Sequence, residues 1–337
     1  MLKQIRRPVA VNTVALATLT VAFAASALAQ NLGQLAALRF LTGVASGAVL
    51  VLTITITLER TSRDRHGLAS GILWAGFGFG VVVSGICAPY VVGDHPSLSW
   101  RQTWLLMSLA GPIVATGFAR AAQTVHTVTL APSTSTAPAV LKRPSSGMLL
   151  IGSSYFLFGT GYITYFTYVI ALVIASGFPA QFAGLLWSFC GLAGILGGVF
   201  AGRALDGRFA FVVLPVVLGI GALGAFLGVL ASSIAIATGA LLMGFSFLST
   251  PATVSTLLKK LSTLATYPQV LSYVTATFAV GQFLGPVVGG VVVDATSLRG
   301  GVVFSGILMC SATLLAIMNS LQPIRHGDAA GEMRART

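Results

Sequence analysis

Ten apolar segments, each of a length suited to crossing a lipid bilayer, constrain this chain more than any other feature of its sequence. A membrane-spanning helix needs about 20 mostly apolar residues. The segments are residues 9–29, 35–58, 68–92, 103–119, 147–175, 181–201, 209–231, 234–258, 270–293 and 300–321. None shows the strict alternation that the strands of a transmembrane barrel require. The sequence therefore predicts an all-α polytopic membrane protein with ten transmembrane helices.

The composition excludes a soluble globular protein. Hydrophobic residues make up 55% of the chain and charged residues only 8%, whereas about a quarter of the residues of a soluble domain are charged. The net charge of +12 would suit a nucleic-acid-binding protein only if the basic residues were gathered on one face or tail. They are instead dispersed among the short segments between the spans. We therefore expect a lipid bilayer, and no nucleic acid, around this chain.

The basic residues fall almost entirely on one side of the membrane if the amino terminus is cytoplasmic. The opposite side then carries only Arg101 and Arg299, and Arg39 lies within a span. The other sixteen of the 19 lysines and arginines lie in cytoplasmic segments. Cytoplasmic loops of membrane proteins are enriched in Lys and Arg. This bias predicts a protein of the inner (plasma) membrane with both termini in the cytoplasm.

The first segment is open to two interpretations. Lys3, Arg6 and Arg7 precede an apolar run, which is the order of parts in a cleaved signal peptide as well as in a first transmembrane helix. The run from Val9 to Ala29 is uncharged throughout, whereas the apolar core of a signal peptide has roughly 7–15 residues. This length favours a membrane span.

A weak internal repeat also favours a span. Gly85 and Asp94 recur two hundred positions later as Gly285 and Asp294, in equivalent spans. The same offset places the loop at residues 202–208 over residues 2–8. The first segment then corresponds to the span at residues 209–231, in the middle of a repeat. The second half has six spans and the first half only four, so the repeat predicts two helices before Met1.

Three motifs resemble signatures of the major facilitator superfamily. The segment Gly202-Arg-Ala-Leu-Asp206-Gly-Arg208 resembles its G-x-x-x-D-[RK] loop, and Arg39-Phe-Leu-Thr-Gly43 resembles its R-x-x-x-G motif of the fourth helix. The segment Gly281-Gln-Phe-Leu-Gly285-Pro286-Val-Val-Gly289-Gly290 is similar to its G-x-x-x-G-P-x-x-G-G helix motif. Residues 39–52 and 155–171 are most similar to the YbfB/YjiJ type of this superfamily.

The resemblance implies twelve helices in two halves, with helices one, four, seven and ten around a central cavity. Residues 1–120 would form helices three to six, 121–146 a cytoplasmic linker, 147–322 a complete six-helix bundle and 323–337 a cytoplasmic tail. The first two helices would precede Met1, either because the start codon is misassigned or because the gene is truncated.

The function implied by this resemblance is secondary active transport of a small organic solute by alternating access, coupled to protons, by a monomer. The alternative is a non-transporting remnant or membrane scaffold left by truncation. We expect no enzyme activity, cofactor or metal, because the four histidines lie in loops and the sequence has no HExxH, GxSxG or P-loop motif.

Arg39 and a stripe of tyrosines are the candidates for solute binding or coupling. An arginine inside an apolar span should face a cavity or a partner group, although it could also extend along the helix to the membrane interface. Tyr155, Phe158, Tyr162 and Tyr165 are spaced to share one helix face. That face would bind solute or would simply pack against other helices.

The remaining candidates concern helix movement and packing. Gln282 lies in the middle of a span and would either bind solute or form a hydrogen bond between helices. Pro251 should kink its helix, as a gate or as a static bend. The resemblance assigns Gly202, Asp206 and Arg208 to a cytoplasmic gate, with a solvated turn as the alternative. Helix packing is expected of Gly281, Gly285, Pro286, Gly289 and Gly290.

Overall fold

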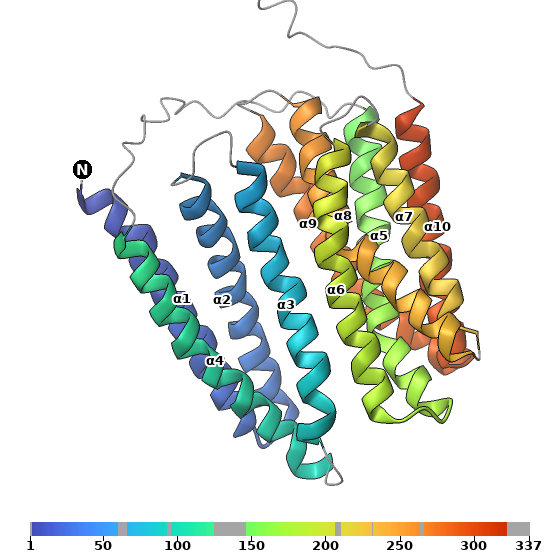
Figure 1. Ribbon diagram of the computed structural model, residues 1–337, viewed down its shortest axis with the longest axis horizontal. Helices are drawn as coiled ribbons and strands as arrows, with labels where there is room; N and C mark the ends of the chain where they lie inside the picture. Colours follow the sequence, from blue (N-terminus) through green and yellow to red (C-terminus); the bar gives the residue numbers. More distant parts are fainter. Residues whose placement is uncertain are drawn as a thin grey trace, which may run out of the picture. The chain divides into compact units, whose positions relative to one another are not determined.

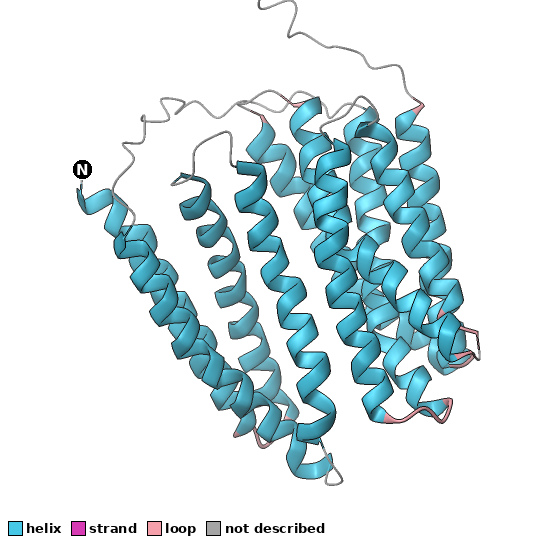
Figure 2. Ribbon diagram, viewed as in Figure 1, coloured by secondary structure: helices cyan, strands magenta, loops and turns pink. Residues whose placement is uncertain are grey.

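The computed structural model describes residues 2–59, 66–92, 96–124, 146–205, 210–230, 232–262 and 266–321. Within these ranges the chain forms ten helices and no strands (Figures 1 and 2). The helices are α1 (Leu2–Ala27), α2 (Leu32–Glu59), α3 (His66–Val92), α4 (Pro96–Thr124), α5 (Ser146–Ala175), α6 (Ala180–Leu205), α7 (Ala210–Leu227), α8 (Ser233–Leu261), α9 (Tyr267–Ala295) and α10 (Leu298–Ser320). All ten are long and apolar enough to cross a membrane.

The all-α fold class and the ten spans predicted from the sequence are confirmed. Two helix boundaries differ from the apolar segments. Helix α4 begins at Pro96, whereas the apolar segment in the sequence begins at residue 103. Proline is tolerated in the first turn of a helix because its nitrogen needs no hydrogen-bond partner there, so the helix can start at Pro96, before its apolar part. Helix α7 ends at Leu227 rather than near residue 231, where the bonds from Val229 N to Phe226 O and from Leu230 N to Leu227 O form tight turns.

The chain divides into two compact units. Unit 1 comprises residues 1–136 and 178–195, and unit 2 comprises residues 137–177 and 196–337. The first part of α6 thus clusters with α1–α4, whereas the sequence analysis grouped the whole helix with the carboxy-terminal bundle. Close backbone contacts explain this: a Cβ atom on Gly85 of α3 would lie 2.6 Å from the carbonyl oxygen of Gly184, and one on Gly191 would lie 2.6 Å from that of Gly78. The domain boundaries expected from the sequence stay a prediction.

In unit 1, α1 packs lengthwise along α2 and α4. Asn12 of α1 is fully buried, and its Nδ2 donates a hydrogen bond to Thr53 Oγ1 of α2 at 3.2 Å. Gly111 of α4 lies directly against Thr20 of α1, so that a side chain would not fit at this position of α4. The first apolar segment is therefore an integral part of the packing of this unit.

In unit 2, α5 packs along α9 and α10, and α7 packs along α8 and α10. Hydroxyl groups join α10 to α5: Ser154 Oγ donates to Ala312 O at 2.8 Å, and Ser305 Oγ donates to Gly161 O at 2.7 Å. Phe158 and Met309 are fully buried between these helices. Side-chain hydroxyls thus supplement the van der Waals packing that drives helix association in lipid.

Candidate functional site

The tyrosine stripe of α5 is buried against other helices of unit 2. Tyr155, Phe158, Tyr162 and Tyr165 are each exposed by 6% or less. Phe278 of α9 stacks on Tyr155 with ring centroids 4.2 Å apart and on Tyr162 at 5.9 Å. The common helix face predicted from the spacing is present, and within unit 2 this face packs against neighbouring rings.

Tyr162 is the centre of this cluster. Its ring lies 4.9 Å from that of Phe158 and 5.2 Å from that of Phe247 on α8. Its hydroxyl oxygen accepts a hydrogen bond from Nε2 of Gln282 on α9. Three helices therefore meet at one tyrosine, and the amide of Gln282 has the partner on another helix that a polar group in lipid requires.

Phe278 and Phe247 were not among the residues singled out from the sequence. Phe278 lies four residues before Gln282, so both lie on one face of α9, and that spacing was an available signal. No local pattern marks Phe247, because its place in the cluster depends on how α8 packs against α5.

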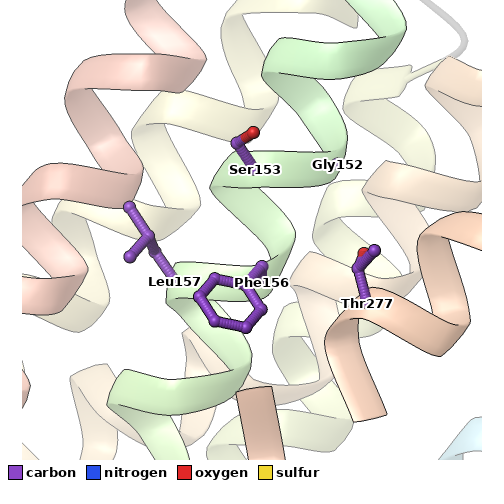
Figure 3. A pocket seen from close by; sticks show the side chains of 5 residues that line it. All are labelled: Gly152, Ser153, Phe156, Leu157 and Thr277. Carbon is purple, nitrogen blue, oxygen red and sulfur yellow. The ribbon is translucent and has the colours of Figure 1, made fainter. Parts of the chain in front are cut away.

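A hollow on unit 2 lies along α5, on the opposite face of this helix from the tyrosine stripe (Figure 3). Its volume is about 350 Å³, and it is lined by Gly152, Ser153, Phe156 and Leu157 of α5 and by Thr277 of α9. Thr277 directly precedes Phe278 of the ring cluster. None of these five side chains carries a charge.

The glycine motif of α9 lies along α5. A Cβ atom on Gly281 would lie 2.5 Å from the carbonyl oxygen of Phe156, and one on Gly285 would lie 2.6 Å from that of Thr160. One on Gly289 would meet Thr164 Cγ2 at 2.8 Å, and one on Gly290 would meet Tyr168 Oη at 3.1 Å. The hydroxyl of Tyr168 donates to the carbonyl oxygen of Pro286 at 2.7 Å. At Gly281 and Gly285, α9 and α5 are in direct backbone contact, whereas Gly289 and Gly290 face side chains of α5.

Helix α8 continues through Pro251 without interruption. The neighbouring hydroxyls bond to carbonyl groups of the preceding turn: Ser249 Oγ donates to Phe245 O at 2.6 Å, and Thr250 Oγ1 donates to Ser246 O at 2.8 Å. Such bonds satisfy the hydroxyls inside the helix.

Arg39 of α2 is held by groups from α1 and α4, within unit 1. Its guanidinium carbon lies 4.0 Å from the ring centre of Trp104 and 5.4 Å from that of Phe23. These two rings stack with centroids 5.7 Å apart. One guanidinium nitrogen of Arg39 donates to Ser26 Oγ, and its Nε is buried without a hydrogen-bond partner. The sequence indicated that Arg39 needs a cavity or a partner group, but it did not indicate that Trp104, Phe23 and Ser26 are its partners.

The loop motif lies mostly outside the described residues. Gly202 is in α6, whereas Asp206 and Arg208 follow its end and are among the residues not described. One contact marks this end of the helix: Lys260 Nζ of α8 donates to the carbonyl oxygen of Leu205 at 2.9 Å. A cation at the carboxyl end of a helix is favoured by the helix dipole.

Comparison with known proteins then identifies the family. The family model described as the uncharacterised MFS-type transporter YbfB matches residues 1–322. The chain belongs to the major facilitator superfamily. No curated protein sequence gives a significant match.

Solved structures of major facilitator transporters share the fold. The fucose:proton symporter FucP of E. coli is 13% identical, with a TM-score of 0.65, and the match covers 94% of this chain and 84% of FucP. The human organic anion transporter MFSD10 is 15% identical, with a TM-score of 0.66, and the match covers 92% of this chain and 77% of MFSD10. Family and fold together make this chain a multi-pass membrane protein of a transporter superfamily.

Proposed function

We propose that this chain is a secondary active transporter of the inner membrane. It moves a small organic solute by alternating access, and a proton gradient drives this transport. The observation that carries the proposal is the match of a transporter family model over residues 1–322. The structural likeness to FucP, which is named a fucose:proton symporter, supports coupling to protons. A non-transporting scaffold has no comparable support.

In this proposal, Tyr155, Tyr162 and Tyr165 of α5, together with Gln282, support the solute pathway from within unit 2. Their rings pack against neighbouring rings, and the Gln282 amide bonds to the Tyr162 hydroxyl, so this face of α5 keeps the helix in place beside the pathway. Pro251 lies in α8, next to the same cluster in the fold, because Phe247 of α8 contacts Tyr162. A change in the bend of α8 would therefore reach the tyrosines directly.

Arg39 has a structural role in this proposal. Its guanidinium joins α1, α2 and α4 through Ser26, Trp104 and Phe23. A charged group that is hydrogen-bonded and covered by rings is less available to a solute. We assign to it the task of keeping three helices of unit 1 in fixed relative positions.

Gly202, Asp206 and Arg208 form the proposed cytoplasmic gate. A carboxylate in a loop between two helices, with arginines on both sides, would stabilise one of the two access states and so set their equilibrium. Lys260 of α8, whose Nζ donates to the carbonyl oxygen of Leu205, adds a positive group at the carboxyl end of α6, where this loop begins.

Transport is tested with the purified full chain in liposomes that contain a pH-sensitive dye. A solute panel of fucose, neutral aryl glycosides and organic anions is added from outside, with and without an imposed pH gradient. We expect at least one solute to move protons inward, and we expect Asp206→Asn to slow this movement while Asp294→Asn, at the far end of α9, leaves it unchanged. If no solute moves protons and none exchanges across the membrane, the proposal is wrong and the scaffold alternative stands.

A further inference from the structure

The hollow on unit 2 has the size of a small-molecule site. Ligand pockets have volumes of about 300–1,000 Å³ and combine an apolar wall with a few polar groups. This hollow has about 350 Å³, an apolar wall of Phe156 and Leu157, and two hydroxyl groups, those of Ser153 and Thr277 (Figure 3). It therefore suits a molecule of one ring or two, rather than a peptide.

The polar groups of the hollow are neutral. A hydroxyl group can donate one hydrogen bond and accept two. Thr277 Oγ1 uses its proton on the carbonyl oxygen of Val274 at 2.9 Å, which leaves its lone pairs to accept from a solute. Ser153 is exposed and is free to donate or accept. A solute carboxylate would meet no positive charge among the lining residues, so it would form no charge-assisted hydrogen bond there.

Phe156 offers a ring face to a solute. Tyr155, Phe158 and Tyr162 of the same helix stack on one another or on Phe278, whereas Phe156 contacts no other ring among the described residues. Its backbone is fixed by α9, because Gly281 lies against its carbonyl oxygen. A half-buried aromatic side chain on a rigid backbone, at the edge of a hollow, is suited to stacking on a flat ring.

Arg39 is not among the residues that line the hollow. Its guanidinium belongs to unit 1 and is already engaged with Ser26 and with the rings of Trp104 and Phe23. Organic anions are commonly recognised by arginine through paired, charge-assisted hydrogen bonds. The chemistry of the hollow thus favours a neutral solute over an anionic one.

We infer that this hollow is the binding site for the transported solute, and that this solute is a small uncharged molecule that combines a flat ring with hydroxyl groups. The inference rests on the proposed transport function, whose substrate class it specifies. The ring would stack on Phe156, and the solute hydroxyls would bond to Ser153 and Thr277.

Two probes that differ at a single carbon test this inference. Phenyl β-D-glucoside is neutral, and phenyl β-D-glucuronide carries a carboxylate in place of its C6 hydroxymethyl group. Binding of each radiolabelled probe to the purified full chain in detergent is measured by equilibrium dialysis, which requires no transport. We expect the glucoside to bind at least about tenfold more tightly than the glucuronide, the equivalent of about 1.4 kcal/mol.

Three variants locate the site. Ser153→Phe fills the hollow and should weaken glucoside binding at least about tenfold. Phe156→Leu keeps an apolar wall but removes the ring, and the loss of stacking should weaken binding about two- to tenfold. Thr167→Phe is the matched control, because Thr167 is exposed on the same helix but lies outside the hollow. It should bind the glucoside as the unaltered chain does.

The outcomes separate this inference from the proposed function. Tighter binding of the glucuronide, no binding of either probe, or unchanged glucoside binding by Ser153→Phe would each overturn the site or its substrate class, even if other solutes move protons in liposomes. Glucoside binding that is lost in Ser153→Phe, with no movement of any solute in liposomes, would support the site and contradict transport. Equal elution of all variants in size-exclusion chromatography shows that each is folded.

Discussion

Arg39 illustrates, at the scale of single residues, how an apolar helix accommodates a charge. An arginine at the centre of a span costs about 2.5–3.5 kcal/mol on insertion scales, which is an upper bound for Arg39 near the start of α2. A contact between a cation and an aromatic face is worth about 0.5–2 kcal/mol, depending on its exposure, and a hydrogen bond from a charged group about 1.5–3 kcal/mol. The contacts with Trp104, Phe23 and Ser26 are therefore of the same order as this cost.

The first prediction concerns the contact between Arg39 and Trp104. We expect Trp104→Leu to destabilise the chain, because the guanidinium loses the ring face that covers it. In the Arg39→Leu background the same change should cost less, so that the two residues show a coupling of about 0.5–2 kcal/mol. The measurement is the free energy of unfolding in mixed micelles for all four members of the cycle.

Trp74 provides the control for this cycle, since it stacks on Phe77 of its own helix at 5.3 Å and is not among the contacts of Arg39. Trp74→Leu should show no coupling to Arg39→Leu. Additive effects of Arg39→Leu and Trp104→Leu would contradict the structural role that we assign to the arginine.

The second prediction concerns Gln282 and Tyr162. Tyr162→Phe removes the acceptor of the Gln282 amide and should destabilise the chain by about 0.6 kcal/mol, the average for polar pairs between membrane helices. Gln282→Leu combined with Tyr162→Phe should be no less stable than Tyr162→Phe alone. Thermal unfolding in detergent measures both, and Tyr273→Phe is the control because Tyr273 on α9 is 67% exposed. Equal losses in the two tyrosine variants would contradict the prediction.

At the scale of helices, the seam between α5 and α9 depends on the absence of side chains. Gly281 and Gly285 each lie so close to a carbonyl group of α5 that a Cβ atom would be 2.5–2.6 Å from its oxygen. Backbone atoms cannot move aside as the end of a flexible side chain can. One added methyl group must therefore push the two helices apart.

The third prediction follows from this geometry. We expect Gly285→Ala to lower the melting temperature by several degrees, which corresponds to about 1–3 kcal/mol for an overpacked contact. Gly43→Ala is the matched control, because a Cβ atom on Gly43 of α2 would meet nothing within 4 Å. It should leave the stability unchanged or raise it, since alanine favours a helix over glycine by up to about 1 kcal/mol. Equal melting temperatures for Gly285→Ala and the unaltered chain would exclude direct backbone contact.

The helices were predictable from the sequence because each one carries its own signal. A run of about 20 apolar residues between basic loops is a local property, and all ten such runs became helices. The common face of Tyr155, Phe158 and Tyr162 was likewise predictable, because helical periodicity alone places these residues together. Helix boundaries were less certain, as α4 shows, since polar residues can extend a helix beyond its apolar part.

The partners of these residues were not predictable in the same way. Trp104 lies 65 residues from Arg39 along the chain, and Phe247 lies on a different helix from the tyrosines that it contacts. Which faces of two helices meet depends on their crossing angle and on the small residues at each contact. The hollow beside Phe156 also results from the packing of α5 against α9. The apolar sequence around Phe156 therefore did not predict the hollow.

At the scale of the whole molecule, transport by alternating access requires each unit to remain internally stiff. Movement in such transporters is largely that of rigid bodies around a fixed solute site. The contacts found within the units have this character: Arg39 joins three helices of unit 1, and the backbone seam joins α5 to α9 in unit 2. In the proposed transport cycle, the side chains of each unit would therefore keep their geometry while access to the solute site changes.

The last prediction concerns the orientation of the chain in the membrane. Ten spans place both termini on one side, and sixteen basic residues on that side indicate that it is the cytoplasm. The loop between α2 and α3 should then be cytoplasmic, and the loops after α1 and after α9 should face outward. We expect a membrane-impermeant maleimide to label Gln30→Cys and Ser297→Cys in intact cells, but not Ser62→Cys.

These variants are made after Cys87, Cys190 and Cys310 are replaced by alanine, so that each chain has a single thiol. A membrane-permeant maleimide should label all three, which shows that a lack of reaction at Ser62→Cys reflects its location. Labelling of Ser62→Cys alone would reverse the orientation and with it the assignment of the Asp206 loop to the cytoplasm. Eight helices, α2 to α9, lie between residues 30 and 297. Labelling of Gln30→Cys without Ser297→Cys would mean that an odd number of these eight cross the membrane, so that at least one of them does not.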